Sequence, residues 1–360
     1  MPFRPRYTGL IDRYRDRLPV HDDTRIISLG EGNTPLIRLN NIPDWTGKEI
    51  DIYIKYEGLN PTGSFKDRGM TMAVTKAVED DSGAIICAST GNTSASAAAY
   101  AARAGIKAFV LIPEGKIAMG KLAQAMMHGS VVIQIKGNFD VGMQLVKDVA
   151  EKAPVTIVNS INPFRLQGQK TAAFEILEEL GGAPDFHCLP VGNAGNISAH
   201  WMGYKEYHEH GIVNDTPCMV GYQAAGAAPF IRGAMVDDPE TVATAIRIGH
   251  PQSWDKAWDV KKESNGWFDE CSDNEILAAQ KLLAEKEGIF CEPASATSVA
   301  GALRDIKAGK IPEGSKVVCT LTGHGLKDPD TAIKQSTAKM ISIDANLSSV
   351  EKAILSQLDS

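Results

Sequence analysis

The sequence predicts an α/β protein built from two doubly wound parallel-sheet domains. Short apolar segments alternate with helical segments of about a dozen residues, the pattern of parallel strands joined by helical crossovers. The chain has 360 residues, which is long enough for two domains. Hydrophobic residues make up 43% of it and 33 residues are glycine, which indicates a large aliphatic core with many tight turns.

The first half of the chain gives the most regular alternation. Residues 10–18 form a charged amphipathic stretch, residues 31–36 a turn into a short strand, and residues 50–56 a strand with alternating apolar positions. Helices and strands then alternate in this order: helix 66–80, strand 84–89, helix 92–104, strand 107–112, helix 117–128, strand 131–135, helix 138–152 and strand 156–158. Gly105 and Gly129 follow two of these helices, as expected at helix ends.

The second half continues in the same style with longer intervals. Its expected elements are helix 165–180, strand 185–191, a helix to residue 208, strand 218–223, helices 273–287 and 294–307, strand 316–321 and helix 348–358. Residues 239–265 are less regular and partly helical. Because no linker or repeat interrupts the chain, we expect two closely packed domains: a small one of residues 57–158, and a large one of residues 1–56 and 159–360.

Composition excludes several classes of protein. The net charge of −7 disfavours nucleic acid as a partner, since neutralising phosphates requires a basic surface. The six cysteines form no CxxC pair and no ligand cluster is visible, so we expect reduced thiols and no metal site. The N-terminal stretch lacks the apolar core of a signal peptide, and no apolar run could span a bilayer. We therefore expect a soluble cytoplasmic protein without membrane partners.

The most informative stretch is residues 60–69, Asn-Pro-Thr-Gly-Ser-Phe-Lys-Asp-Arg-Gly. Turn-forming residues precede Lys66, and a helix with few breakers follows it. Lys66 therefore stands at a helix N-terminus with backbone on both sides, where its amine could form a Schiff base with a cofactor aldehyde. A solvated surface lysine is the alternative, because lysine is seldom buried.

Polar turns follow the strands, at the edge where open parallel sheets bind their ligands. Residues 89–94, Ser-Thr-Gly-Asn-Thr-Ser, either offer hydroxyls and backbone N–H groups to an anion or cap the next helix. Residues 192–198 contain Gly192 and Gly195, whose spacing lets the backbone approach a phosphate closely. This turn matches neither the dinucleotide fingerprint nor a Walker loop.

Two further turns carry candidate side chains. Thr322 follows the last strong strand and could hydrogen-bond the edge of a ligand ring, while His324 is either a general base or a turn residue. Asn159 and Ser160 follow an earlier strand, with Arg165 shortly after them. A guanidinium beside amide and hydroxyl donors suits an anion, because it binds phosphate oxygens in a fork. The alternative is an arginine that covers the following helix.

Taken together, these segments resemble the fold-type II pyridoxal-phosphate enzymes, and among them the threonine synthase family. The matching segments are residues 31–36 (Glu-Gly-Asn-Thr-Pro-Leu), 60–69, 89–94, 192–196 and 322–329, in the family's order and at its spacing. The lysine motif is the most specific of them. The resemblance implies a tryptophan-synthase-β-like fold with pyridoxal 5′-phosphate in the cleft between the two domains.

The resemblance also implies roles for single residues at the cofactor. Lys66 would form the Schiff base and serve as general base. Asn92 would hydrogen-bond the phenolic ring oxygen, and Thr322 would face the pyridine nitrogen. The cofactor phosphate would lie on the backbone N–H groups of Gly192, Asn193, Ala194, Gly195 and Asn196.

For the substrate, the resemblance implies O-phospho-L-homoserine. Its carboxylate and the near side of its phosphate would contact Ser89, Thr90 and Thr93. The distal phosphate site would consist of Asn159, Ser160 and Arg165.

The implied reaction is γ-elimination of phosphate followed by addition of water at the β carbon. It gives L-threonine and phosphate, the last step of threonine biosynthesis, in a cytoplasmic homodimer. A threonine or serine dehydratase is the nearest rival, but it needs no distal phosphate site. Cysteine synthase is disfavoured by the lysine motif. A non-catalytic phosphate-binding protein on the same scaffold is the alternative from another class.

Overall fold

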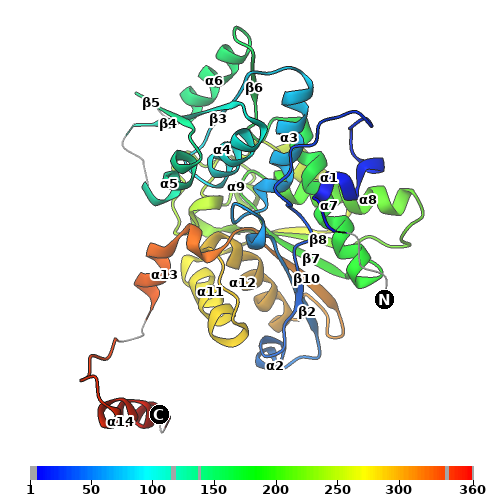
Figure 1. Ribbon diagram of the computed structural model, residues 1–360. Coiled ribbons are helices and arrows are strands. Elements are labelled where there is room, and N and C mark those ends of the chain that lie inside the picture. The colour runs from blue at the N-terminus through cyan, green and yellow to red at the C-terminus, as the bar shows by residue number, and fades with distance from the viewer. Residues whose placement is uncertain (1–5, 115–118, 137–138, 337–339, 359–360) are drawn as a thin grey trace.

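The computed structural model describes residues 6–114, 119–136, 139–336 and 340–358. Within these residues the strands form a four-stranded sheet, in the order β5-β4-β3-β6, and a six-stranded sheet, in the order β1-β2-β10-β7-β8-β9. Figure 1 shows the small sheet at the top of the molecule and the large sheet below it. The α/β fold class predicted from the sequence is confirmed.

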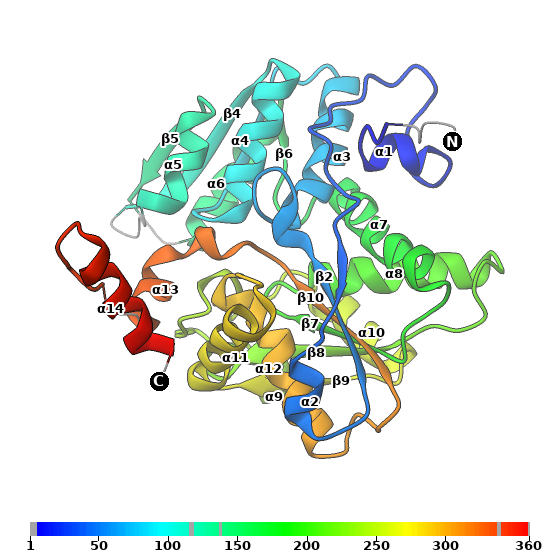
Figure 2. The same ribbon diagram turned by 60° about the horizontal axis from the view of Figure 1, so that its bottom comes forward.

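The small sheet is wholly parallel and has helices on both faces. Its strands are β3 (Ala84–Ala88), β4 (Lys107–Pro113), β5 (Val131–Ile135) and β6 (Val155–Ile157). The helices α3 (Lys66–Glu79), α4 (Asn92–Ala104) and α5 (Met119–Met127) bury one face, and α6 (Phe139–Ala150) packs on the other (Figure 2). This arrangement is doubly wound, as expected.

The large sheet is parallel except at one edge, where β1 pairs antiparallel with β2. Its strands are β1 (Leu36–Arg38), β2 (Asp51–Tyr56), β7 (Phe186–Pro190), β8 (Cys218–Ala224), β9 (Trp267–Cys271) and β10 (Lys316–Leu321). One face is covered by α2 (Ile42–Thr46), α11 (Asp273–Glu287) and α12 (Pro293–Lys307). The other is covered by α1 (Leu10–Arg13), α7 (Pro163–Leu180), α8 (Gly195–Glu209) and α10 (Trp254–Glu263).

Short elements complete the described chain. They are the 3-10 helices η1 (Arg15–Arg17), η2 (Glu57–Leu59), η3 (Ala225–Ala227), η4 (Thr244–Ile246) and η5 (Gly325–Lys327), and the helices α9 (Pro229–Arg232), α13 (Pro329–Gln335) and α14 (Leu347–Leu358). The last of these, α14, lies at the periphery of the molecule (Figure 1). No helix in the described ranges combines the length and the apolar character that a membrane span requires.

Several elements differ from the sequence prediction. The stretch 10–18 divides into α1 and η1, and residues 239–265 contain only η4 and α10 as helices. Strand β9 was not predicted; it is a short edge strand with two acidic residues, Asp269 and Glu270, so its apolar alternation is weak. The antiparallel edge was not predicted either. The connection between β1 and β2 contains the short helix α2, and the chain reverses direction through it.

A buried ion network joins the start of β1, β2, α3 and α7. Arg68 donates from Nε to Glu57 Oε2 at 2.7 Å and from Nη2 to Glu175 Oε2 at 2.6 Å. Lys55 Nζ donates to the same Glu175 oxygen at 2.8 Å and to Thr34 O at 2.6 Å. Burial alone would raise the pKa of Glu175, but the positive charges of Arg68 and Lys55 bring it below its ordinary value. The network fixes α3, and hence Lys66 at its first turn, against the rest of the molecule.

Candidate active site

The lysine loop is tied to the end of β10. Phe65 N donates to Thr322 O at 2.9 Å, and His324 N donates to Gly63 O at 2.9 Å. These two bonds make an antiparallel bridge between the loop and the segment after β10. Gly63 has a φ of 84°, a conformation that glycine adopts without strain. Lys66 is thereby held beside Thr322, although the two residues lie far apart in the chain.

The first turn of α3 is also fixed from within. Asp67 accepts hydrogen bonds from Thr62 N at 2.7 Å and from the hydroxyls of Thr62 and Ser96, both at 2.6 Å. Burial raises the pKa of Asp67 to about 6 in spite of these bonds. The carboxylate therefore closes the turn around Lys66 and links it to α4.

The amine of Lys66 lies in a partly buried position. Its Nζ is 4.3 Å from the centroid of the Phe65 ring, and it makes no hydrogen bond within the described part of the chain. Burial lowers the pKa of Lys66 to about 7, the charge of Arg165 contributes to this lowering, and the charge of Glu292 opposes both. A substantial share of this amine is neutral near pH 7, which is the form that attacks an aldehyde.

Arg165 lies on the first turn of α7, near enough to Lys66 for its charge to lower the pKa of the lysine amine. Its guanidinium is buried, Nη1 donates to Val158 O at 3.2 Å, and Nε has no partner among the described residues. Burial lowers the pKa of Arg165 to about 10. A buried donor without an acceptor is costly, so the site is suited to an anion that the guanidinium can bind.

Asn159, predicted beside Arg165, uses its side chain in a different way. Its Oδ1 accepts from Ala88 N at 3.0 Å and its Nδ2 donates to Ala88 O at 2.9 Å. The amide thus extends the backbone pairing at the end of β3 and leaves one N–H for other contacts. Ser160, next in the chain, is partly exposed.

The turn after β3 leads into α4 without a side-chain cap at Gly91. Within it, Ser89 Oγ accepts from Gly91 N at 3.2 Å. The side chains of Ser89, Thr90 and Thr93 are partly exposed. Asn92 Nδ2 donates to Glu292 Oε1 at 3.1 Å. This contact joins the start of α4, on the small sheet, to the residue before α12, on the large sheet. The uncapped N–H groups of α4 remain available to an anion.

The turn after β7 leads into α8, which also begins without a side-chain cap. Ala194 has a φ of 62°, which lets the turn present successive N–H groups in one direction. A Cβ at Gly192 would lie 3.0 Å from Ile246 Cα, so a larger residue would crowd the neighbouring backbone. Gly195 is next to Leu166, the residue after Arg165, which brings this turn to the same cleft.

Asn196 and Asn193 behave differently within that turn. Asn193 is used locally: its O accepts from Ser253 N at 3.2 Å and its Oδ1 from Gln252 N at 3.3 Å. Both polar atoms of the Asn196 side chain are buried and have no partner in the described ranges. Such atoms indicate a place where a bound group completes the hydrogen bonding.

Thr322 is fixed by a residue that the sequence reasoning did not identify. Its Oγ1 lies 3.0 Å from Ser295 Oγ, and Ser295 Oγ accepts from Gly323 N at 2.8 Å. Glu292 was also not identified, although Pro293 at the first position of α12 marks the residue before it as the N-cap position. His324 behaves as a turn residue, since its Nδ1 accepts from Leu326 N at 3.1 Å and burial lowers its pKa.

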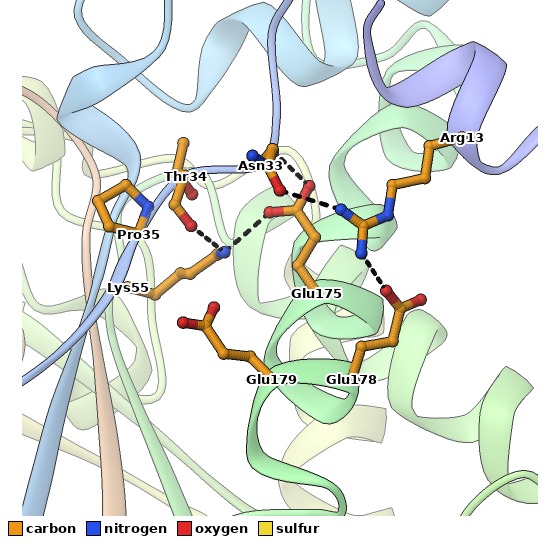
Figure 3. A pocket seen from close by; sticks show the side chains of 8 residues that line it. All are labelled: Arg13, Asn33, Thr34, Pro35, Lys55, Glu175, Glu178 and Glu179. Atoms are coloured by element: carbon orange, nitrogen blue, oxygen red, sulfur yellow. Dashed lines mark hydrogen bonds and ion pairs between the residues drawn. The ribbon is translucent and has the colours of Figure 1, made fainter. Parts of the chain in front are cut away.

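A pocket of about 390 Å³ does not include Lys66 in its lining (Figure 3). Its lining residues are Arg13, Asn33, Thr34, Pro35, Lys55, Glu175, Glu178 and Glu179. Most of its charges are already matched: Lys55 pairs with Glu175, and Arg13 pairs with Glu178 at 2.5 Å. The pocket belongs to the buried ion network. Within the described residues no cluster of side chains could hold a metal ion.

Comparison with known proteins gives the chain relatives along most of its length. A family model described as "Pyridoxal-phosphate dependent enzyme" matches residues 27–323. A threonine synthase of Synechocystis sp. is 59% identical over 331 residues, which are 92% of this chain and 86% of that protein. A threonine synthase of Mycobacterium tuberculosis is 60% identical over 329 residues, 91% of each chain.

Solved structures of more distant proteins share the fold. An L-serine ammonia-lyase from Rhizomucor miehei superposes with a TM-score of 0.73 at 20% identity, covering 86% of this chain and 99% of that one. Maize serine racemase superposes with a TM-score of 0.71 at 21% identity, covering 91% and 93%. These likenesses show the fold, whereas the close relatives show the family. The chain therefore belongs to the pyridoxal-phosphate dependent enzyme family and, within it, to the threonine synthases.

Proposed function

We propose that the chain converts O-phospho-L-homoserine and water into L-threonine and phosphate, with pyridoxal 5′-phosphate bound at Lys66. The observation that carries the proposal is that a lysine amine and a buried arginine lie close enough for the charge of the arginine to act on the amine. The pKa of Lys66 is lowered to about 7, and Arg165 Nε has no partner among the described residues. One group suits an aldehyde and the other suits a phosphate.

The residues present fit the cofactor. The turn from Gly192 to Asn196 has an uncapped helix start, a left-handed residue at Ala194 and an unpartnered side chain at Asn196. These features support a phosphate site built largely from backbone N–H groups. Thr322 carries a hydroxyl and no charge, so it would contact the ring nitrogen without firmly protonating it.

When bound, the cofactor supplies an electron sink next to the substrate's amino group. In the proposed reaction, Lys66 Nζ takes the proton from the substrate's α carbon and then moves a proton from its β carbon. A pKa of about 7 suits both tasks, because the amine can accept and release a proton near neutral pH. Phosphate leaves the γ carbon, and that carbon then receives a proton. Water adds its hydroxyl at the β carbon, and the α carbon regains a proton to give L-threonine.

The substrate's phosphate would be bound by Arg165 with Asn159 and Ser160, and its carboxylate by Ser89, Thr90 and Thr93. Support comes from the buried guanidinium and from the uncapped start of α4. Because Asn159 already holds Ala88, we assign it a single N–H contact at most. Phosphate kept by Arg165 after cleavage could assist the addition of water.

The proposed domains are residues 57–158 and residues 1–56 with 159–360. Support comes from the separate cores of the two sheets. Movement of one toward the other would exclude water from the cleft until the hydration step. We also propose a cytoplasmic homodimer; sedimentation of the purified protein tests its dimeric state.

A threonine or serine dehydratase is the alternative, since proteins of that kind share the fold. Threonine deaminase isoform 2 from Solanum lycopersicum superposes with a TM-score of 0.71 at 22% identity, covering 84% of this chain and 87% of that one. Arg165 argues against this alternative, because a dehydratase substrate has no distal phosphate to neutralise a buried guanidinium.

The deciding experiment measures phosphate release from O-phospho-L-homoserine and identifies the amino acid formed. We expect threonine from the wild type, and neither product nor a visible cofactor band from Lys66→Ala. L-threonine and L-serine serve as control substrates for the dehydratase. Ammonia release from these, without phosphate release from the phosphorylated substrate, would replace the proposal by the dehydratase.

A further inference from the structure

Glu292 is the least expected side chain of the cleft. It precedes α12 and is 3% exposed. Its Oε1 accepts a hydrogen bond from Asn92 Nδ2 at 3.1 Å. Its backbone N donates to Gly323 O at 3.1 Å. A Cβ at Gly323 would lie 2.3 Å from Glu292 Oε1, so the glycine provides the space that the carboxylate occupies. The packing around Gly323 therefore fixes the position of the Glu292 carboxylate.

The contact with Glu292 decides how the Asn92 amide is turned. A carboxylate only accepts hydrogen bonds, so the nitrogen and not the oxygen of the amide must face it. An amide nitrogen carries two N–H groups, and one of them is taken by Glu292. The same nitrogen lies 3.4 Å from Glu292 Oε2, so the carboxylate contacts it with both oxygens. This leaves at most one N–H of Asn92 to donate to an oxygen of a bound group.

The charge of Glu292 acts on Lys66 as well. It raises the pKa of the Lys66 amine, against the lowering by burial and by Arg165 on α7. The other titratable groups nearby have partners of their own: Asp67 on α3 binds Thr62, and His324 after β10 binds Leu326 N. The charges of Glu292 and Arg165 thus shift the pKa of the Lys66 amine in opposite directions.

We propose that Glu292 is a positioning residue for the cofactor. It holds the Asn92 amide with one N–H directed at the ring oxygen, and its charge favours the protonated form of the nitrogen that joins Lys66 to the cofactor. The inference rests on the proposed contact between Asn92 and the cofactor. Glu292 would act on the cofactor in two ways: by orienting the Asn92 amide, and by the effect of its negative charge on the nitrogen that joins Lys66 to the cofactor.

The test compares the wild type with Glu292→Gln and Glu292→Asp by titrating the visible band of the bound cofactor, which reports the protonation of that nitrogen. In Glu292→Gln we expect the midpoint to fall by about one pH unit, because a nearby negative charge is lost. Glu292→Asp keeps the charge and should stay near the wild-type midpoint. Glu313→Gln, at an exposed position, is the control for a loss of charge elsewhere.

The second readout is the affinity for pyridoxal 5′-phosphate, measured by fluorescence titration of cofactor-free protein. Glu292→Gln should weaken binding about tenfold, as expected for a hydrogen bond to a charged group. In an Asn92→Ala background the same change should cost little more, since Glu292 acts on the cofactor oxygen through that amide.

An unmoved midpoint in Glu292→Gln, or additive losses of affinity in the double variant, would overturn the inference. Should Glu292→Gln fail to fold, Glu292→Asp serves for the affinity cycle with Asn92→Ala, because its shorter side chain keeps the charge and loses the contact with the amide. A wild type that shows no visible band at all would instead remove the proposed function, so the two failures are distinguishable.

Discussion

Lys66 and Arg165 are two cations that share one cleft, and burial lowers the proton affinity of both. The pKa of the lysine falls to about 7, with a contribution from the charge of Arg165, and that of the arginine falls to about 10. Only the lysine comes within reach of neutral pH. Arg165 therefore stays positively charged near neutral pH, whereas the Lys66 amine can accept and release a proton there.

The lowered pKa of Lys66 predicts how fast cofactor-free protein captures pyridoxal 5′-phosphate. With a pKa of about 7, the amine is roughly 10% neutral at pH 6 and roughly 90% neutral at pH 8, so the rate should rise and then level off. Stopped-flow absorbance measures it, with Nα-acetyl-lysine as the control amine for the cofactor's own titrations. A rate that climbs steadily to pH 10 would show that Lys66 titrates like an ordinary lysine.

Arg165→Lys tests the phosphate contact because it keeps the charge and removes the fork. We expect KM for O-phospho-L-homoserine to rise about tenfold, and more of the product to appear as α-ketobutyrate instead of threonine. Arg103→Lys, on the exposed side of α4, is the matched control. If KM and the partition between products both stay at the wild-type values, Arg165 does not bind the substrate's phosphate.

For single residues, the sequence predicts which turns follow the strands better than it predicts the partners of individual side chains. The alternation of strands and helices predicted polar turns that contain Asn92 and Thr322 after two strands, and the family resemblance implied their roles. In the structure the lysine loop bridges to the segment after β10, and Asn92 contacts Glu292. The sequence could not predict that Glu175 would bind both Arg68 and Lys55, because these partners lie 107 and 120 residues away along the chain. Nor could it predict the position of the Glu292 carboxylate, which occupies the space that a side chain at residue 323 would fill.

At the scale of elements, the close crossing of α3 and α7 sets the distance between Lys66 and Arg165. Gly168 makes the crossing possible, since a Cβ there would lie 1.8 Å from Arg68 O. Gly69 on the facing helix is less crowded: its ideal Cβ would lie 2.8 Å from Gln169 Nε2 and 3.0 Å from Arg165 O. Both helices therefore approach backbone to backbone, one turn beyond the two functional side chains.

Gly168→Ala should force the helices apart. We expect the free energy of unfolding to fall by about 2 kcal/mol or more, since the clash is with backbone and cannot be relieved by a rotamer. The activity of the folded fraction should fall as well, because Lys66 and Arg165 separate. Denaturant unfolding and specific activity measure the two effects.

Gly182→Ala is the matched control, as an added Cβ there meets nothing within 4 Å. Equal stability of the two variants would mean that the crossing has room to relax and does not set the distance.

The same scale explains which elements were predictable. Helices and strands with strong periodicity, such as α4 and β3, lie within a residue or two of the predicted bounds. Strand β9 was missed because it is an edge strand with a polar sequence, and α13 because its seven residues carry no apolar stripe. Both are held by their neighbours more than by their own propensity.

At the scale of the molecule, polar contacts join the elements around the small sheet to those around the large sheet. Lys327 Nζ, on η5, donates to Thr62 O at 3.0 Å and to Gln124 Oε1 on α5 at 2.8 Å. Asn92 and Glu292 make the corresponding contact inside the cleft. Such polar links can open and close without disturbing either core.

We expect bound O-phospho-L-homoserine to slow amide hydrogen exchange in the turns after β3 and β6 and at the start of α7, because closure orders the phosphate site. Exchange in β8 and β9 should not change. Mass spectrometry resolves these segments, and homoserine, which lacks the phosphate, is the control ligand. Equal protection by homoserine would argue that closure does not depend on the phosphate.

The strand order of the large sheet has a consequence for synthesis of the chain. Strand β10 lies between β2 and β7, yet it ends only at residue 321. The small sheet is complete once residue 157 has left the ribosome, whereas the large sheet lacks a central strand until its last one emerges. Until then β2 and β7 present unpaired inner edges to the surrounding solvent, the kind of surface on which nascent chains aggregate. Translation speed and chaperone access late in the message therefore bear on the yield of this protein more than events in its first half.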